Sequence, residues 1–205
     1  MTALRVHQFF PGVCPLLGPA LLVWVQGCPR RCPGCFNQAT LDENGPARRM
    51  TPGELAAESD LCGGALVLSG GEPFSQAEGL SETCRLIRAA RPDVRILVYS
   101  GYYLEELRQA KRGDWDALLG QVDVLVDGPY EFERATDLPL AGSDNQSVCL
   151  LSGRVTVDEL QELDQAHVQV SFALGQLRIV GAGSGAMDMH GLMKRLRAQG
   201  VVIEK

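Results

Sequence analysis

The chain has 205 residues, 45% of them hydrophobic, and a formal net charge of −6 at pH 7. This length and content predict one domain with a packed core and room for a small appendage. An acidic chain without a run of Lys and Arg argues against nucleic acid as the main partner. The longest apolar run, residues 16–25, is interrupted by Gly18 and Pro19 and is too short to span a membrane. Because the first residues also lack the apolar segment of a signal peptide, we expect a cytoplasmic protein without a membrane partner.

Short apolar runs predict buried strands at residues 21–26, 65–68, 94–99 and 122–126. Helical signals separate them. Thr51 and Glu54 form a capping box with Pro52 at the first helical position, and Ser75 with Glu78 predicts a second capping box for a helix that ends near residue 90. Further helices are expected at residues 104–111 and after residue 114. The alternation of strands and helices predicts an α/β fold with a parallel sheet.

Residues 153–205 predict a small α+β extension beyond a core of residues 1–152. Thr156 and Glu159 form a third capping box, which predicts a short helix. Alternating apolar residues at 167–172 and 177–180 predict a β-hairpin. A glycine-rich turn at 181–185, a helix at 187–198 and a strand at 201–203 complete the expected extension. This segment either covers the open edge of the sheet or binds a partner.

The most informative motif is one loop, Cys28-Pro-Arg-Arg-Cys32-Pro-Gly-Cys35, directly after the first predicted strand. Its prolines and glycine prevent a helix, so the loop can point three thiolates at one centre. Such thiolates suit zinc or an iron–sulfur cluster. A four-iron cluster with three protein ligands leaves one iron free for a further ligand. A structural zinc ion requires a fourth protein ligand, for which the candidates are Cys14, Cys62, Cys84 and Cys149. Otherwise these four are expected to be small buried residues.

Three other unusual turns also follow predicted strands: Gly70-Gly71-Glu72, Ser100-Gly101 and Asp127-Gly128. In a parallel sheet these positions share the carboxyl edge with the cysteine loop, and that edge is where such folds bind ligands. Gly70 and Gly71 would let the backbone approach a ligand closely, and Glu72 could accept hydrogen bonds from a ligand amine. The alternative is that each turn is an ordinary strand-to-helix connection, with Glu72 as a surface charge at a helix N-terminus.

The ordered motifs resemble the radical S-adenosylmethionine (radical SAM) superfamily, and within it the activating proteins of anaerobic (class III) ribonucleotide reductases. The matching segments are His7-Gln-Phe-Phe-Pro11, Gly27 to Asn37, Leu68 to Pro73, Ser100-Gly-Tyr102, Leu104-Glu-Glu-Leu107, Val124 to Gly128 and Gly142-Ser-Asp-Asn-Gln146. Together they extend over residues 7–147. The resemblance implies a partial (βα)6-type radical SAM barrel.

The resemblance also implies that Cys28, Cys32 and Cys35 hold a [4Fe–4S] cluster. S-adenosylmethionine would bind the free iron and be cleaved by one electron to a 5′-deoxyadenosyl radical, which abstracts hydrogen from a glycine of a partner glycyl-radical enzyme. A reduced flavodoxin or ferredoxin-type protein would supply the electron. The implied S-adenosylmethionine contacts are Gly34, Phe36, Gly70, Gly71, Glu72, Ser100, Asp127 and Asn145.

The chain departs from this family in one motif. Where the family usually carries Gly-Pro-Gly-x-Arg, this chain has Gly18-Pro-Ala-Leu-Leu22, without the arginine. That departure and the long tail favour an alternative, a radical SAM enzyme that acts directly on a small molecule or peptide. A third alternative is a non-catalytic iron–sulfur or zinc protein, against which the Gly70-Gly71-Glu72 turn argues, because a structural metal site does not need a second ligand pocket.

Overall fold

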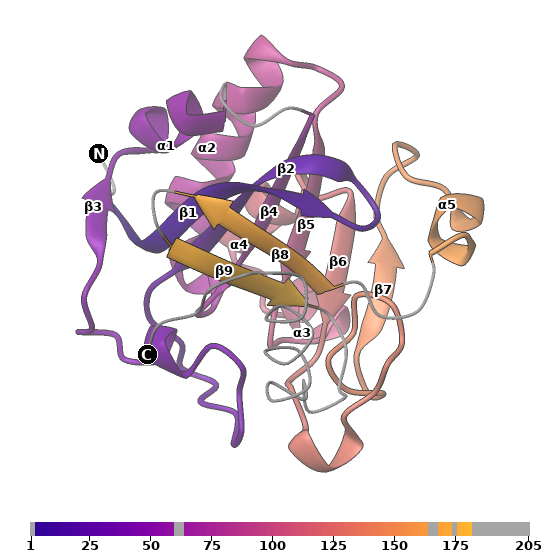
Figure 1. The fold of residues 1–205 in the computed structure, drawn as a ribbon. Helices are drawn as coiled ribbons and strands as arrows, with labels where there is room; N and C mark the ends of the chain where they lie inside the picture. Colours follow the sequence, from indigo (N-terminus) through magenta and orange to yellow (C-terminus); the bar gives the residue numbers. More distant parts are fainter. Residues whose placement is uncertain (1–2, 60–63, 164–167, 174–175, 182–205) are drawn as a thin grey trace.

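The computed structural model describes residues 3–59, 64–163, 168–173 and 176–181. Its main feature is a seven-stranded sheet in the order β3-β1-β2-β4-β5-β6-β7 (Figure 1). The strands are β1 (Leu4–Cys14), β2 (Gly18–Val25), β3 (Arg48–Met50), β4 (Ala65–Gly70), β5 (Arg95–Tyr99), β6 (Val124–Asp127) and β7 (Ser147–Leu150).

The four strands predicted from the sequence, β2, β4, β5 and β6, pair in parallel. The predicted parallel sheet is present only in part, because β1, β3 and β7 pair antiparallel to their neighbours. The reason is the length of the connection: only three residues, Pro15 to Leu17, separate β1 from β2, and parallel neighbours need a long crossover. The fold is therefore mixed α/β with a partly parallel sheet.

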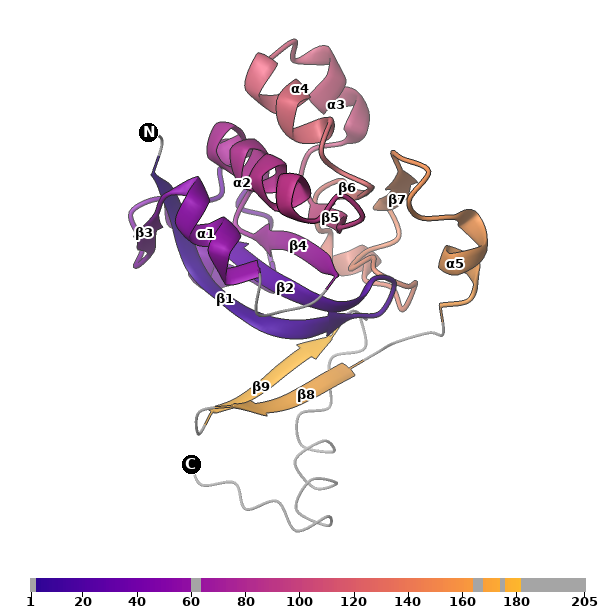
Figure 2. The ribbon, with the colours of Figure 1, turned by 90° about the horizontal axis from the view of Figure 1, so that it is seen from above.

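Helices cover one face of this sheet, which we call the outer face. They are α1 (Pro52–Glu58), α2 (Ala77–Ala90), α3 (Leu104–Gln109) and α4 (Gly113–Leu119), and Figure 2 shows them together on one side of the strands. In β2, Leu21, Val23 and Val25 join the core beneath the helices, whereas Leu22 joins a second apolar cluster on the opposite, inner face. Both faces are apolar, as expected for strands buried on both sides.

The N-termini of the helices can be compared with the predicted capping boxes. At α1, the Thr51 hydroxyl accepts from the Glu54 amide and the Glu54 carboxylate accepts from the Thr51 amide, which confirms that capping box. The box of Thr156 and Glu159 at α5 (Val157–Gln161) is confirmed in the same way. The box predicted at Ser75 was wrong: Pro73–Gln76 forms a 3-10 turn and α2 begins only at Ala77.

The chain beyond β7 first returns to the sheet. Val155 is 2% exposed within the inner-face cluster, and Leu160 and Leu163 pack against that cluster. The predicted hairpin is present as β8 (Val168–Ala173) and β9 (Gln176–Gly181), which pair antiparallel. Cys62, most of the predicted glycine-rich turn, the predicted helix at 187–198 and the predicted strand at 201–203 lie outside the described residues. Within the described part of the chain, no helix has the length and apolar character needed to cross a membrane.

Candidate functional site

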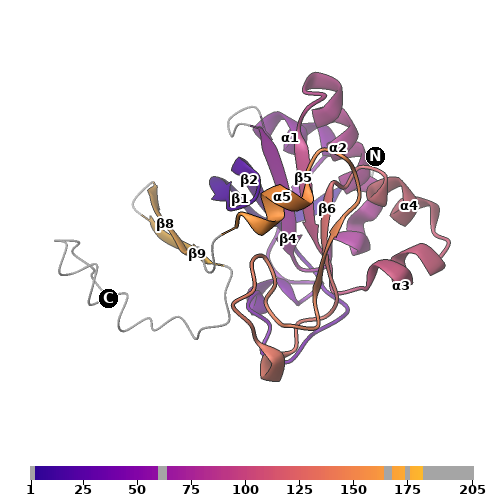
Figure 3. The same cartoon turned by 90° about the vertical axis from the view of Figure 1, so that its right-hand side faces the viewer.

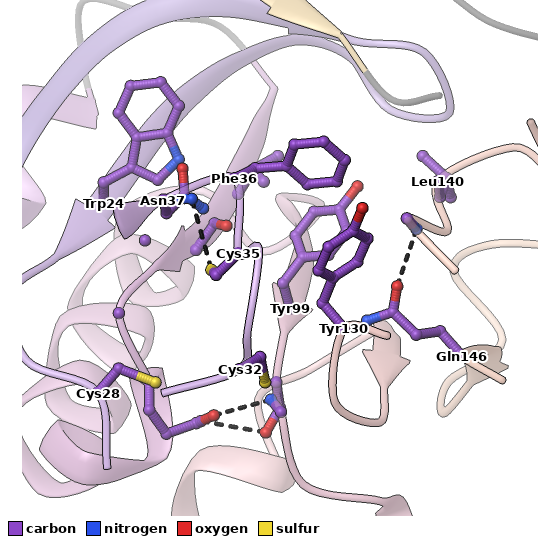
Figure 4. Close-up of a pocket in the computed structure, with 18 of the residues that line it drawn as sticks. Trp24, Cys28, Cys32, Cys35, Phe36, Asn37, Tyr99, Tyr130, Leu140 and Gln146 are labelled. Carbon is purple, nitrogen blue, oxygen red and sulfur yellow. Dashed lines mark hydrogen bonds between the residues drawn. The ribbon is translucent and has the colours of Figure 1, made fainter. Parts of the chain in front are cut away.

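A cavity of about 620 Å³ lies on the inner face at the carboxyl edge of the parallel strands. The cysteine loop and the turns after β4, β5 and β6 all contribute to its wall (Figure 4). Its polar and sulfur-bearing lining includes Cys28, Cys32, Cys35, Asn37, Glu72, Ser100 and Gln146, and its apolar lining includes Val13, Leu22, Trp24, Val67, Tyr99 and Leu140. The predicted convergence of four distant motifs on one edge is therefore present in the structure.

Backbone hydrogen bonds hold the start of the cysteine loop. The Gly27 amide donates to the Thr40 carbonyl (2.8 Å) and the Cys28 amide donates to the Leu41 carbonyl (3.1 Å). Gly27 has a φ of 99°, a conformation that favours glycine, so the chain can turn sharply out of β2 at this point. From this point residues 28–35 form a loop, and its three thiols lie on the cavity wall (Figure 4).

The three thiols have partly buried, polar surroundings. Burial raises the pKa of the Cys28 and Cys35 thiols, and nearby backbone amides counteract part of that rise. The Asn37 amide, for example, donates to the Cys35 sulfur at 3.4 Å. Amide donors of this kind favour the thiolate form, which is the form that binds iron.

Three cysteine thiols on one cavity wall are a donor set that a four-iron cluster can take, with one thiol to each of three irons. Among the described residues, no group of three His, Cys, Asp or Glu side chains is arranged to hold a single metal ion. Of the candidate fourth zinc ligands, Cys84 is buried in the outer core, Cys14 is buried on the inner face, and Cys149 is half-buried against the outer core. The expectation of small buried residues thus holds for Cys14 and Cys84.

The Gly70-Gly71 turn packs directly against the chain that leaves β2. The Gly71 amide donates to the Val25 carbonyl (2.8 Å) and the Glu72 amide donates to the Gly27 carbonyl (2.9 Å). A Cβ atom at Gly71 would overlap the Gly27 carbonyl oxygen, and Gly70 has a φ of 96°. The glycines therefore hold the two turns together, and this contact fixes the start of the cysteine loop.

Glu72 is the buried carboxylate of the site, with 1% of its surface exposed. Its Oε1 accepts from the Phe74 amide (2.9 Å) and the Ser100 hydroxyl (3.0 Å), and its Oε2 accepts from the Gly101 amide (2.8 Å). Burial raises its pKa to about 7 despite these donors. The alternative of a surface charge at a helix start is therefore wrong, because the side chain is enclosed and joins the turns after β4 and β5.

The other residues predicted as cofactor contacts do not all lie at the cavity. Phe36 lines the cavity, is 65% exposed and packs against the Tyr130 ring with centroids 4.6 Å apart. Gly34 lies under the Phe132 side chain, which a Cβ there would approach to 3.1 Å. Asp127 and Asn145 are absent from the cavity lining and hold loops instead. Asp127 accepts from the Leu104 amide (2.7 Å), and Asn145 donates to the Pro129 carbonyl (2.8 Å).

Several lining residues were missed by the sequence interpretation: Trp24, Arg30, Tyr99, Tyr130 and Gln146. Trp24 and Tyr99 could have been found, because each is the last inward-facing residue of its strand before a motif turn. Gln146 belongs to the matching segment Gly142–Gln146, but the sequence interpretation assigned no role to it. It accepts from the Gly142 amide (2.8 Å) and donates to the Gly128 carbonyl (2.9 Å), so only the folded loops bring it to the cavity.

Comparison with known proteins places these features in a family. Residues 17–149 match the family model of the 4Fe-4S single cluster domain. An anaerobic ribonucleoside-triphosphate reductase-activating protein of Vibrio cholerae is 34% identical over 155 residues, which are 71% of this chain and 97% of that protein. This chain belongs to that family of activating proteins.

Other members are similarly related. The activating protein of Enterobacteria phage T4 is 34% identical over 136 residues, 63% of this chain and 82% of that protein. The one from Haemophilus influenzae is 32% identical over 139 residues, 64% of this chain and 87% of that protein. The cysteine loop lies within residues 17–149, the segment that matches the 4Fe-4S single cluster domain.

Proposed function

We propose that this protein is a [4Fe–4S]- and S-adenosylmethionine-dependent activase that forms a glycyl radical in an anaerobic ribonucleotide reductase. The observation that carries the proposal is that one cavity wall joins three cysteines of one loop to the Gly-Gly-Glu turn of the next strand. A metal site with a purely structural role needs no adjoining ligand cavity. When bound, the cluster and its sulfonium cofactor supply one-electron chemistry that ends in removal of a hydrogen atom from glycine.

In this proposal Cys28, Cys32 and Cys35 hold three irons of the cluster. Glu72 stands on the same wall as a buried acceptor, and a cofactor ammonium group beside it would offset the cost of burying its charge. Ser100 orients that carboxylate through its 3.0 Å hydrogen bond. Phe36 continues the wall toward the adenine, Gly34 lets the loop pass under Phe132 beside it, and Gly70 and Gly71 hold the two turns in register.

Asp127 and Asn145 would act through the loops that they hold. Asp127 accepts from the backbone at the starts of both α3 and β7, and Asn145 fixes the carbonyl of Pro129. We assign them as positioning residues for the turn after β6. The surrounding fold would then be a partial (βα)6-type barrel of residues 1–152, with helices outside and the cavity inside, followed by an extension of residues 153–205.

The partner is inferred from the names of the relatives, which are reductase-activating proteins. A reduced flavodoxin or ferredoxin-type protein would supply the electron. The direct test is to incubate the anaerobically reconstituted protein with reductant, S-adenosylmethionine and an anaerobic ribonucleotide reductase from the same organism. We expect a glycyl-radical EPR signal on the reductase. Cofactor cleavage without any signal on the reductase would refute the assignment of the partner.

One observation favours a second candidate, an S-adenosylmethionine enzyme that acts directly on a small molecule. Leu22 replaces the arginine of the family motif, and its side chain lines the cavity with 7% of its surface exposed. The cavity is therefore apolar where the motif predicts a positive charge. Substrate-dependent hydrogen abstraction from a small molecule, in the absence of any reductase, would support this candidate over the first.

A further inference from the structure

Large apolar side chains that remain exposed gather at one edge of the sheet. Among the described residues, two of the six exposed ones lie near the amino ends of the parallel strands. Val13 pairs with Pro19 at the start of β2. Val157 begins α5, a helix that is bonded to the first residue of β5. The other four, which we call the rim patch, belong to loops at the carboxyl edge: Phe36 (65% exposed), Tyr103 (36%), Phe132 (67%) and Leu138 (50%).

Two neighbouring segments form the centre of the rim patch. A Cβ at Gly34 would approach Phe132 to 3.1 Å, and the Phe36 ring packs against Tyr130 with centroids 4.6 Å apart. Residues 34–36 and 130–132 therefore run alongside each other in opposite directions. Figures 1 and 3 show the cysteine loop and the loop after β6 at the same end of the sheet.

Leu138 and Tyr103 are attached to the loop after β6. The Ala141 amide donates to the Leu138 carbonyl (3.3 Å), and Ala141 lines the cavity. Tyr103 packs against Gly128, where a Cβ would lie 2.8 Å from the ring. All four members of the rim patch are thus connected to the residues that border the cavity.

Charged side chains of the same loop pair with one another. The Arg134 guanidinium contacts the carboxylates of Glu131 (3.4 Å) and Asp144 (2.6 Å). Apolar and aromatic side chains bordered by charged groups are typical of protein–protein interfaces, in which aromatic residues are enriched. Exposed apolar patches on a soluble protein often mark such interfaces.

The size of the cavity distinguishes a protein substrate from a small one. Its volume of about 620 Å³ is typical of a site for one small ligand, so a bound cofactor leaves a protein substrate outside, on the rim. Phe36 belongs to both the cavity wall and the rim patch, so the two surfaces are continuous. A small substrate held inside the cavity would not need the other three exposed side chains.

We propose that the rim patch is the docking surface for the reductase, and that it receives an apolar surface beside the glycine that becomes the radical. The proposal rests on the proposed function, from which it takes the partner. Docking at this place brings the glycine to the opening of the cavity and covers the opening from water. Phe132 is the main anchor, because it is the most exposed aromatic residue of the patch.

The affinity for an anaerobic ribonucleotide reductase from the same organism, measured by biolayer interferometry, tests this proposal. The protein is first reconstituted anaerobically with iron and sulfide. We expect Phe132→Ser to raise the dissociation constant by at least about tenfold and Leu138→Ser by about threefold. The matched control Val157→Ser removes an apolar side chain of similar exposure (57%) from α5 and should bind as the wild type does. Equal dissociation constants for the wild type, Phe132→Ser and Leu138→Ser would overturn the proposal.

Cofactor cleavage without the reductase separates this proposal from the proposed function. With dithionite as reductant, Leu138→Ser and Val157→Ser should form 5′-deoxyadenosine at the rate of the wild type. A wild type that binds the reductase through Phe132 and does not cleave the cofactor would refute the proposed function and support the docking surface. A wild-type dimer that Phe132→Ser converts to a monomer would identify a second copy of the chain on the patch and would overturn the proposal.

Discussion

The two faces of the central sheet are built from the same strands and differ in what they do. On the outer face, Leu66 and Leu68 are fully buried beneath helices, whereas on the inner face Leu22 and Val67 line the cavity and each remains 7% exposed. Alternation along each strand thus divides the sheet into a packed side that stabilises the fold and an open side available for a ligand. Single substitutions on each face can test whether the inner face binds the ligand while the outer face only stabilises the fold.

The largest contrast is expected between cysteines of the two sides. Cys32→Ala removes a proposed iron ligand, and we expect loss of the brown chromophore and of most of the iron after anaerobic reconstitution. The control Cys84→Ala changes a fully buried thiol of the outer core and should keep both. Ultraviolet–visible spectra with iron and sulfide analysis measure the difference. A cluster that persists at full occupancy in Cys32→Ala would break the comparison.

Leucines on the two faces should differ in their contribution to stability. Leu68→Ala in the outer core should lower the free energy of unfolding by about 3 kcal/mol, because it leaves a cavity among close-packed side chains. Leu22→Ala should cost less, about 2 kcal/mol, because this side chain already borders a cavity. Urea unfolding of the protein without cluster, followed by circular dichroism, measures both. Equal losses would show that the inner face is as tightly packed as the outer one.

A substitution at Gly71 tests how the turn after β4 positions the cysteine loop. Gly71→Ala places a methyl group against the Gly27 carbonyl, so we expect a loss of about 2 kcal/mol in stability and reduced cluster occupancy. Gly53→Ala is the control, because a Cβ at Gly53 meets nothing within 4 Å. That variant should be as stable as the wild type or more so. Normal cluster content in Gly71→Ala would argue against the role of this turn in fixing the loop.

The smallest effect is a pH dependence at Glu72. Burial raises its pKa from the ordinary 4.5 to about 7, so the folded state holds a proton that the unfolded state has lost between these pH values. The wild type should therefore lose stability relative to Glu72→Gln as pH rises from about 4.5 to about 7, and the difference should level off above that range. Arg30, Cys28 and Tyr102 interact electrostatically with Glu72 and are retained in both proteins, so their own effects largely cancel. Urea unfolding at pH 5, 6, 7 and 8 gives the comparison, and a constant difference would contradict the pKa shift.

Local signals in the sequence predicted the central part of the fold well. The four parallel strands are apolar runs, and the capping boxes at Thr51 and Thr156 are complete within four residues each. The prediction failed at Ser75, where Pro73 at the start of a 3-10 turn and the Glu72 carboxylate bonded to the Phe74 amide set the chain direction before α2. It also missed β1, whose Pro11 and Gly12 are residues that strands usually lack.

The site shows the same division. The position of each motif directly after a predicted strand indicated which residues gather at the cavity, because turns after parallel strands share one edge of the sheet. Sequence could not predict that Glu72 is enclosed by Ser100 and Gly101, or that Gln146 reaches the wall, because those contacts join segments that are 28 or more residues apart or depend on a long loop. Asp127 matched its motif, yet it holds the backbone of α3 and β7.

The central claim is that the open side of the sheet holds a cluster with three cysteine ligands and a sulfonium cofactor on the remaining iron. The most direct measurement is anaerobic reconstitution with iron and sulfide, reduction, addition of S-adenosylmethionine and chromatographic detection of 5′-deoxyadenosine. We expect a brown protein that forms 5′-deoxyadenosine only when reduced. A colourless protein that binds a single zinc ion and leaves the cofactor intact would contradict the account.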